Sequence, residues 1–148
     1  PEPITELRRI YTMSFANHLA GAYLELADEH EADGQAELAR VERDYVAAAI
    51  RRALDEGDMD AASLNGLAWM TATRDLFLPE ALEAAERADE MEPNSAEVLD
   101  TLAEVYWRMG DFDEAVRVGR RALDVSPGDA YLQSQLEKFE ESKQTGDR

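Results

Sequence analysis

The chain has 148 residues, a formal net charge of −18, an ordinary apolar fraction of 45% and no cysteine. This length suits one domain or a short repeat array, and the composition is that of a folded protein. The lack of cysteine excludes disulfides, thiolate zinc sites and cysteine nucleophiles. The strong negative charge would repel phosphate backbones and anionic lipid surfaces, so neither nucleic acid nor a membrane is expected as a partner.

No apolar run approaches the ~18 residues that a membrane span needs, and no segment resembles a signal peptide. The chain opens Pro1-Glu2-Pro3 without a methionine, which is typical of an excised or processed segment. The sequence leaves the compartment unknown.

The first part of the chain is expected to form one long helical hairpin. Its helices would cover about 4–29 and 35–56, with a turn around 32–34. The apolar stripe of the first helix is made of Ile4, Leu7, Tyr11, Phe15, Leu19, Ala22, Tyr23 and Leu26. The residues expected to face inward on the second helix are Leu38, Val41, Tyr45, Ala48, Ala49 and Ala53.

The rest of the chain is expected to form shorter helices separated by proline and glycine. Pro79 fits the first turn of a helix, where its missing N–H would have no partner anyway. Asn94 or Ser95 can cap the following helix, and Gly110 is a natural stop between two helices. The expected helices lie near 60–73, 79–91, 95–109, 112–125 and 129–143, before a polar tail at 144–148 that is expected to fray.

The chain also matches itself at a spacing of 34 residues. The recurring pairs are Ala81 with Ala115, Ala88 with Ala122 and Pro93 with Pro127. The pattern Leu-x-x-Leu-Ala at 64–68 recurs at 99–103, and Arg-Arg-Ala-Leu-Asp at 51–55 recurs at 120–124, which is close to two periods later. A fixed period of this size predicts stacked helical hairpins rather than one closed bundle.

Residues 64–129 resemble the tetratricopeptide repeat (TPR) family, whose pattern runs over 34 residues. The second standard repeat matches that pattern at Leu99, Leu102, Ala103, Tyr106, Gly110, Phe112, Ala115, Ala122 and Pro127. It departs at Gly119, where an aromatic residue is usual, so some packing is expected to be lost there. The first standard repeat departs at Thr71, where Tyr is usual, at Ala85, where an aromatic is usual, and in a loop that is one residue longer. The hairpin over 4–58 is only TPR-like and lacks the closing proline.

The resemblance implies an all-α, right-handed array of helical hairpins with about seven helices. Its parts would be the elongated hairpin at 4–58, repeats at 61–94 and 95–128, and a solvating cap helix at 129–143. Together they are expected to form a single domain over 1–148. In this family the first helices of the hairpins line a concave groove, where ligands usually lie as extended peptides or short helices.

Motif register in that family implies which exposed side chains would line the groove. They are Asn17, Asn65, Trp69, Thr73, Glu97, Asp100, Glu104, Trp107, Arg108 and Lys138. Trp69 and Trp107 could each anchor a partner or merely cover the edge of the core. Glu97, Asp100 and Glu104 form one stripe. That stripe is either an acidic surface for a basic or amphipathic peptide or a solvated face with an intrahelical pair from Glu104 to Arg108.

Some TPR proteins bind acidic C-terminal tails of chaperones through a clamp of Lys, Arg and Asn. Here acidic residues occupy much of the expected lining, and Arg108 and Lys138 are too few to form such a clamp. Chaperone tails are therefore not expected as partners.

Little in the sequence indicates catalysis. His18 and His30 are expected to be structural or superficial, because a metal site needs convergent ligands at fixed geometry. Carboxylates are too abundant to be diagnostic, and no nucleophile elbow, phosphate loop or dinucleotide fingerprint occurs. The chain is expected to be no enzyme and to bind neither metal nor cofactor.

The favoured function is a protein–protein interaction scaffold that holds a peptide or partner domain in a concave, acidic, Trp-containing groove. The alternative is an oligomerisation or spacer module of a larger multidomain protein, with the long hairpin as the contact of a homo-oligomer. Tyr11, Phe15 and Tyr23 would supply that contact if the second helix does not bury them.

Overall fold

The computed structural model describes residues 18–148. The chain divides into two compact units, Pro1–Met59 and Asp60–Arg148. Helices are the regular elements of the described residues, so the prediction of an all-α fold is confirmed. None of the helices in this part of the chain combines the length and the apolar character that crossing a bilayer would require. The organisation as a single domain stays a prediction.

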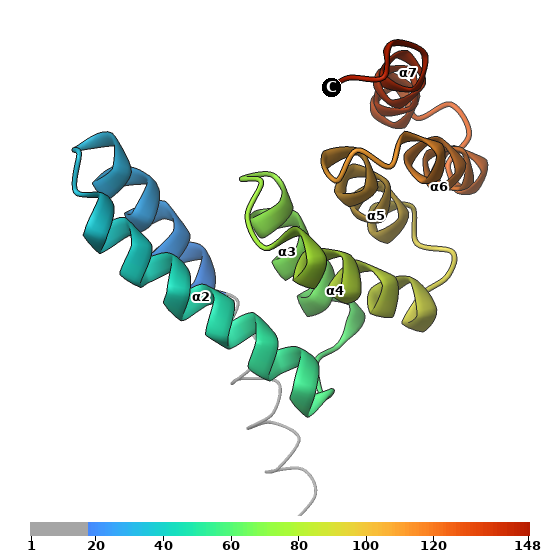
Figure 1. The fold of residues 1–148 in the computed structure, drawn as a ribbon. Helices are drawn as coiled ribbons and strands as arrows, with labels where there is room; N and C mark the ends of the chain where they lie inside the picture. The colour runs from blue at the N-terminus through green and yellow to red at the C-terminus, as the bar shows by residue number, and fades with distance from the viewer. Residues whose placement is uncertain (1–17) are drawn as a thin grey trace, which may run out of the picture. The chain divides into compact units, whose positions relative to one another are not determined.

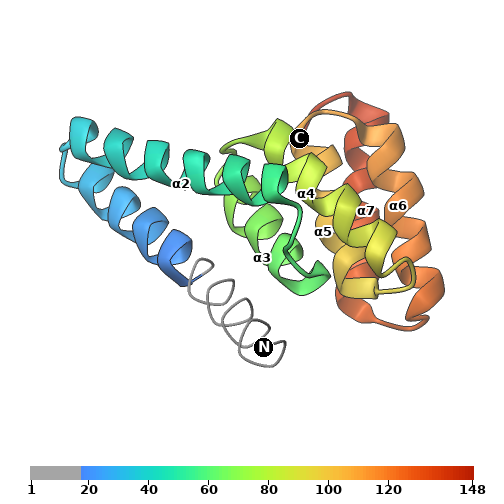
Figure 2. The ribbon, with the colours of Figure 1, turned by 90° about the horizontal axis from the view of Figure 1, so that it is seen from below.

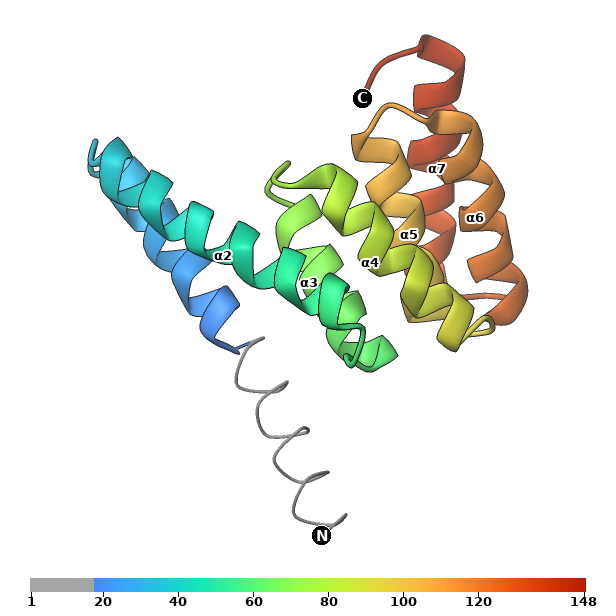
Figure 3. The same cartoon turned by 60° about the horizontal axis from the view of Figure 1, so that its bottom comes forward.

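The first unit contains a helical hairpin. A helix at residues 18–32 runs antiparallel to α2 (Ala36–Glu56), and the two lie side by side (Figure 3). Gly34 in the turn and Gly57 at the end of α2 have φ angles of 76° and 68°. Glycine enters this left-handed region without the steric cost of a Cβ, so it suits these helix ends. Helix α2 ends at Glu56 as predicted, whereas the first helix continues to residue 32, beyond its predicted end at 29.

The hairpin buries a different face from the predicted one. Its buried residues are Ala20, Leu24, Ala27, Ala39, Glu42, Val46, Ile50 and Leu54. Residues that were expected to face inward but are exposed are Ala22, Leu26, Leu38, Val41, Tyr45 and Ala48. The prediction failed because the buried stripe includes small Ala39 and charged Glu42, which bonds His30 Nδ1 at 2.9 Å. The predicted stripe residues Ile4, Leu7, Tyr11 and Phe15 lie outside the described residues.

The second unit is an array of shorter helices. They are α3 (Ala61–Ala72), α4 (Leu78–Met91), α5 (Ala96–Arg108), α6 (Phe112–Val125) and α7 (Ala130–Thr145). Consecutive helices pack against one another, and α5 also contacts both α3 and α7 (Figures 1 and 2). This is the helical hairpin array that the repeat predicted, with each helix end close to its expected position.

Local signals set the helix ends of the second unit. The side chains of Asp60, Ser95 and Asp111 each accept a hydrogen bond from the backbone N–H three residues later. Each of these bonds satisfies an N–H group that the first turn of a helix would leave unpaired. Of the two cap candidates before α5, Ser95 takes the role rather than Asn94. Gly110 has a φ angle of 81° and separates α5 from α6 as expected.

The last helix closes the array through an aromatic side chain. Phe139 of α7 is fully buried and lies against Gly119 of α6, where an added Cβ would be 3.1 Å from its Cδ2. The ring therefore fills the space above the glycine. The expected loss of packing at Gly119 is wrong, because α7 supplies the aromatic group that the repeat itself lacks.

Candidate functional site

Most of the candidate residues lie on α3, α5 and α7. Helices α3 and α5 are the first helices of the two hairpins, and α7 follows the second hairpin. Asn65 of α3 donates to Glu97 of α5 at 3.5 Å, and Gln135 of α7 donates to Asp100 of α5 at 3.2 Å. These bonds join residues 32 and 35 positions apart, which is about one repeat period. The sequence period thus becomes direct contact between corresponding parts of neighbouring hairpins, and it places the candidate residues on one connected face.

Glu104 is the centre of a buried ion-pair cluster and is only 3% exposed. One of its carboxylate oxygens accepts from Arg108 Nε at 3.0 Å. The other accepts from Lys138 Nζ at 2.6 Å and from Gln135 Nε2 at 3.2 Å. The predicted pair between Glu104 and Arg108 therefore exists, but it is buried rather than solvated. A charge is tolerated in such a place because it is paired and hydrogen-bonded.

Asp100 is also buried, one helical turn before Glu104. Burial raises the pKa of Asp100, and the hydrogen bonds that it accepts from Gln135 and Tyr131 oppose that effect. Burial, together with the negative charge of Asp100, raises the pKa of the Tyr131 hydroxyl. The expectation that Asn65, Asp100 and Glu104 are exposed is wrong, because each of them is buried and bonds to a neighbouring helix.

The two tryptophans have different surroundings. Trp69 on α3 is 37% exposed. Trp107 on α5 is half-buried, and its Nε1 donates to Ser142 Oγ of α7 at 2.8 Å. The Trp107 ring also lies 6.4 Å from the Phe139 ring and 4.1 Å from Lys138 Nζ. Trp107 therefore contacts α7 through both its N–H and its ring, whereas part of the Trp69 side chain is exposed to solvent.

The remaining candidates are spread over the same face. Glu97 is exposed, and Thr73, Arg108 and Lys138 are half-buried. The Thr73 carbonyl oxygen accepts from Arg108 Nη1 at 3.2 Å, which ties the end of α3 to the end of α5. Asn17 lies outside the described residues.

Sequence reasoning missed Asp75, although the longer loop between α3 and α4 was a signal for it. In that loop Asp75 and Phe77 have φ angles of 54° and 51°. The N–H groups of Asp75 and Leu76 donate to the carbonyl oxygens of Ala72 and Thr71, so the left-handed conformation of Asp75 ends α3. The Asp75 carboxylate lies 3.3 Å from Arg108 Nη1 and 2.6 Å from Arg148 Nη1. The hydrogen bond from Arg148 holds the pKa of Asp75 below its usual value.

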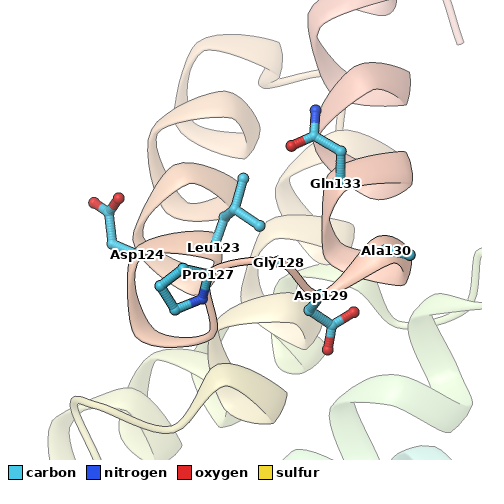
Figure 4. A pocket seen from close by; sticks show the side chains of 7 residues that line it. All are labelled: Leu123, Asp124, Pro127, Gly128, Asp129, Ala130 and Gln133. Carbon is cyan, nitrogen blue, oxygen red and sulfur yellow. The ribbon is translucent and has the colours of Figure 1, made fainter.

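A hollow of about 430 Å³ lies away from this face, at the turn between α6 and α7 (Figure 4). Its lining residues are Leu123, Asp124, Pro127, Gly128, Asp129, Ala130 and Gln133. Asp129 uses its carboxylate to cap α7, and Figure 4 shows the polar groups of Asp124 and Gln133 well apart from it. The hollow therefore lacks the convergent ionisable pair that acid–base catalysis needs. Across residues 18–148, no cluster of histidine and carboxylate side chains is arranged to hold a metal ion.

Part of the chain matches a known protein family. A family model for the tetratricopeptide repeat matches residues 77–127. These residues are a tetratricopeptide repeat segment. Over these residues the match confirms the resemblance that the sequence motifs indicated. A search of curated proteins found no match.

The TPR match covers about a third of the chain and includes α4, α5 and α6. Glu104 and Trp107 therefore lie within the matched segment, whereas Trp69 on α3 and Lys138 on α7 lie to either side of it. TPR segments generally mediate protein–protein interactions and are typically non-catalytic.

Proposed function

We propose that this chain is a non-catalytic scaffold that holds a peptide or partner domain on the face formed by α3, α5 and α7. The general role of TPR segments supports this function. We choose this face because the Trp69 side chain on it is partly exposed to solvent. A tryptophan offers a large apolar area and one donor, and such residues frequently dominate the energetics of an interface.

The chemistry of the partner is basic or amphipathic. Arg108 and Lys138 already neutralise Glu104, so that carboxylate has little attraction left for a ligand. The attraction instead comes from exposed Glu97 and from the net charge of −18. Long-range attraction of this kind is screened by salt, so binding should weaken as ionic strength rises.

Selection from a library of displayed random peptides, followed by titration of the selected peptide, tests the proposal. Trp69→Ala should weaken binding by at least about tenfold, as expected for an anchor residue. Met91→Ala is the matched control, because Met91 is also a large exposed apolar residue but lies on α4. Equal binding by wild type and Trp69→Ala would rule out this face, as would binding that does not respond to salt.

A second candidate function is self-association through the first hairpin. Leu38, Val41 and Tyr45 form a stripe on α2 at spacings of three and four residues, and they are 50%, 62% and 47% exposed. Tyr23 extends this apolar surface onto the preceding helix, with its ring centroid 4.5 Å from that of Tyr45. Several large apolar side chains exposed together are typical of an interaction surface.

The stripe is suited to a second copy of itself. Positions 38, 41, 45 and 48 are symmetric about residue 43. An antiparallel contact between two α2 helices, related by a twofold axis, would therefore place Leu38 opposite Ala48 and Val41 opposite Tyr45. Each bulky side chain would meet a smaller one, which is the arrangement that close packing requires.

Charge is complementary in the same arrangement. Arg52 continues the stripe and would lie within about one helical turn of Glu37 in the second copy. Sedimentation over a range of concentrations tests this candidate, with Val41→Asp expected to abolish the dimer. Val125→Asp, at an exposed site on α6, is the control that should leave it intact. A monomer at every concentration would rule the candidate out.

A further inference from the structure

Three segments that are distant in the sequence meet at one end of the second unit. They are the loop between α3 and α4, the end of α5, and the residues that follow α7 (Figure 2). Arg148 Nη1 donates to Asp75 Oδ1 at 2.6 Å and to the carbonyl oxygen of Arg108 at 3.4 Å. The Arg148 guanidinium carbon lies 5.4 Å from the centroid of the Trp107 ring. A carboxylate, a carbonyl oxygen and an aromatic face thus surround one guanidinium group, and each of them is a favourable partner for arginine.

The carboxylate in this arrangement is held by the fold and not by Arg148 alone. Arg108 Nη1 contacts Asp75 Oδ2 at 3.3 Å, so the two oxygens face different arginines. Arg108 is itself fixed by Glu104 at 3.0 Å and by the carbonyl oxygen of Thr73 at 3.2 Å. One oxygen of Asp75 therefore stays oriented by α5 when Arg148 leaves, and the other remains available.

The backbone at Asp75 fixes the place from which its carboxylate projects. Asp75 has left-handed backbone directly after α3, with a φ angle of 54°. Its N–H donates to the carbonyl oxygen of Ala72 at 2.8 Å, and the N–H of Leu76 donates to that of Thr71 at 3.0 Å. This pattern commonly ends a helix, and aspartate enters it at low steric cost. The capped end of α3 therefore carries the carboxylate.

The other cations near Trp107 do not block the site. Lys138 Nζ and the Arg108 guanidinium carbon lie 4.1 Å and 5.6 Å from the ring centroid. Both are paired with Glu104. Arg108 also contacts Oδ2 of Asp75, so Oδ1 is the oxygen that remains for a further guanidinium, in a chain whose overall charge attracts cations.

We propose that Asp75, the Trp107 ring and the carbonyl of Arg108 form an arginine-binding subsite that the chain's own Arg148 occupies. An arginine side chain of a basic peptide takes the place of Arg148 when the peptide binds. This inference rests on the proposed scaffold function and names the partner chemistry that the scaffold recognises. Displacement is feasible because the side chains of Arg148 and Asp75 are 38% and 45% exposed.

Self-occupation has a quantitative consequence. A tethered group competes at a high effective concentration, and a ligand that needs the open form binds more weakly in proportion to the fraction that is open. Removing the Arg148 side chain should therefore strengthen the binding of any arginine ligand. Removing the charge of Asp75 should weaken that binding in the same background.

The test follows the indole N–H resonance of Trp107 by NMR, in full-length protein carrying Trp69→Phe so that the signal is unambiguous. The probe is Nα-acetyl-arginine methylamide, and its citrulline analogue is the neutral control of nearly the same shape. Arg148→Ala should shift the resonance and tighten probe binding at least about threefold. Adding Asp75→Asn should weaken probe binding about tenfold, the effect of losing a hydrogen bond to a charged group. Asp124→Asn, an exposed change on α6, should leave it unaltered.

Three results would overturn the proposal. The first is a Trp107 resonance that is unchanged in Arg148→Ala. The second is equal affinity for the arginine and citrulline probes. The third is an undiminished affinity for the arginine probe in the Asp75→Asn variant. A selected peptide that is lost with Trp69→Ala but ignores Asp75→Asn and Arg148→Ala would also reject the arginine subsite, while leaving the scaffold function in place. Binding of the arginine probe without any peptide ligand for the face would support the subsite and count against the scaffold.

Discussion

Replacing Glu104 with glutamine tests whether the cluster between α5 and α7 stabilises the second unit. Three donors, from Arg108, Lys138 and Gln135, converge on its two carboxylate oxygens. A glutamine offers one acceptor oxygen, so its amide NH₂ would face at least one of these donors. The substitution keeps the shape of the side chain and removes both the charge and part of the bonding.

The magnitude follows from the burial of the partners. Breaking a buried ion pair by removing one charge costs about 3–5 kcal/mol. The Arg108 and Lys138 side chains are 19% and 33% exposed, so water can partly replace the lost carboxylate. The expected loss of unfolding free energy therefore lies at the lower end, about 3 kcal/mol.

Urea unfolding followed by tryptophan fluorescence measures this loss. Trp69 and Trp107 are the chain's two tryptophans and both lie in the second unit, so the signal reports that unit selectively. Glu141→Gln removes the same charge from an exposed position on α7, and it should change stability by less than about 0.5 kcal/mol. A cost below about 1 kcal/mol for Glu104→Gln would refute the reasoning, because the cluster would then contribute no more than a surface ion pair.

Three further predictions concern the same unit. Phe139→Ala should cost about 3–5 kcal/mol in urea unfolding, because the ring is fully buried over Gly119; a loss below about 1 kcal/mol would contradict that packing. The raised pKa of Asp100 means that its contribution to stability is present below the unfolded-state pKa and is lost as pH rises through the folded-state value. Asp100→Asn should therefore stabilise the protein near pH 7 and lose that advantage in acid, and a difference that does not vary with pH would argue against burial as the cause. The pKa of Asp75 is lowered, so its contribution is present at neutral pH and is lost as pH falls through the folded-state value. The Trp107 indole resonance of the wild type should then move toward its position in Arg148→Ala only at pH values below the usual aspartate pKa. A resonance that does not move in this acid range would contradict the prediction.

The helices of the second unit could be predicted because their signals are local. Ser95 caps α5, Pro79 opens the first turn of α4, and Gly110 ends α5 through its own backbone conformation. Signals of this kind act within one turn of the residue that carries them. The family resemblance added the order of the hairpins, and the match over residues 77–127 agrees with it.

The face of the first hairpin could not be predicted in the same way. Two stripes with apolar residues run along α2, and the one with Leu38 and Tyr45 is exposed, whereas the one with Ile50 and Leu54 is buried. The buried stripe includes Glu42, whose burial depends on His30 in the preceding helix. A pattern that scores each residue by its own hydrophobicity gives no weight to such a partner.

The burial of Glu104 in the candidate site could not be predicted for a related reason. Lys138 and Gln135, which cover Glu104, stand 34 and 31 positions later in the chain. The stripe on α5 is acidic whether or not another helix lies over it, so its residues alone could not reveal the burial. Asp75 was missed although the longer loop was visible in the sequence. The two arginines that contact it, Arg108 and Arg148, come from distant parts of the chain, so the loop alone could not reveal them.

The attachment of α7 determines how the second unit can open. Phe139 closes the space above Gly119, and Ser142 accepts the indole proton of Trp107, so the anchoring contacts lie along the middle and the end of the same helix. Leu132 and Leu136 are buried nearer the start of α7, so partial detachment from either end would expose a buried side chain. Amide hydrogens of α7 should therefore exchange with solvent together and nearly as slowly as those of α5, which makes the outermost helix of the unit a cooperative part of its core.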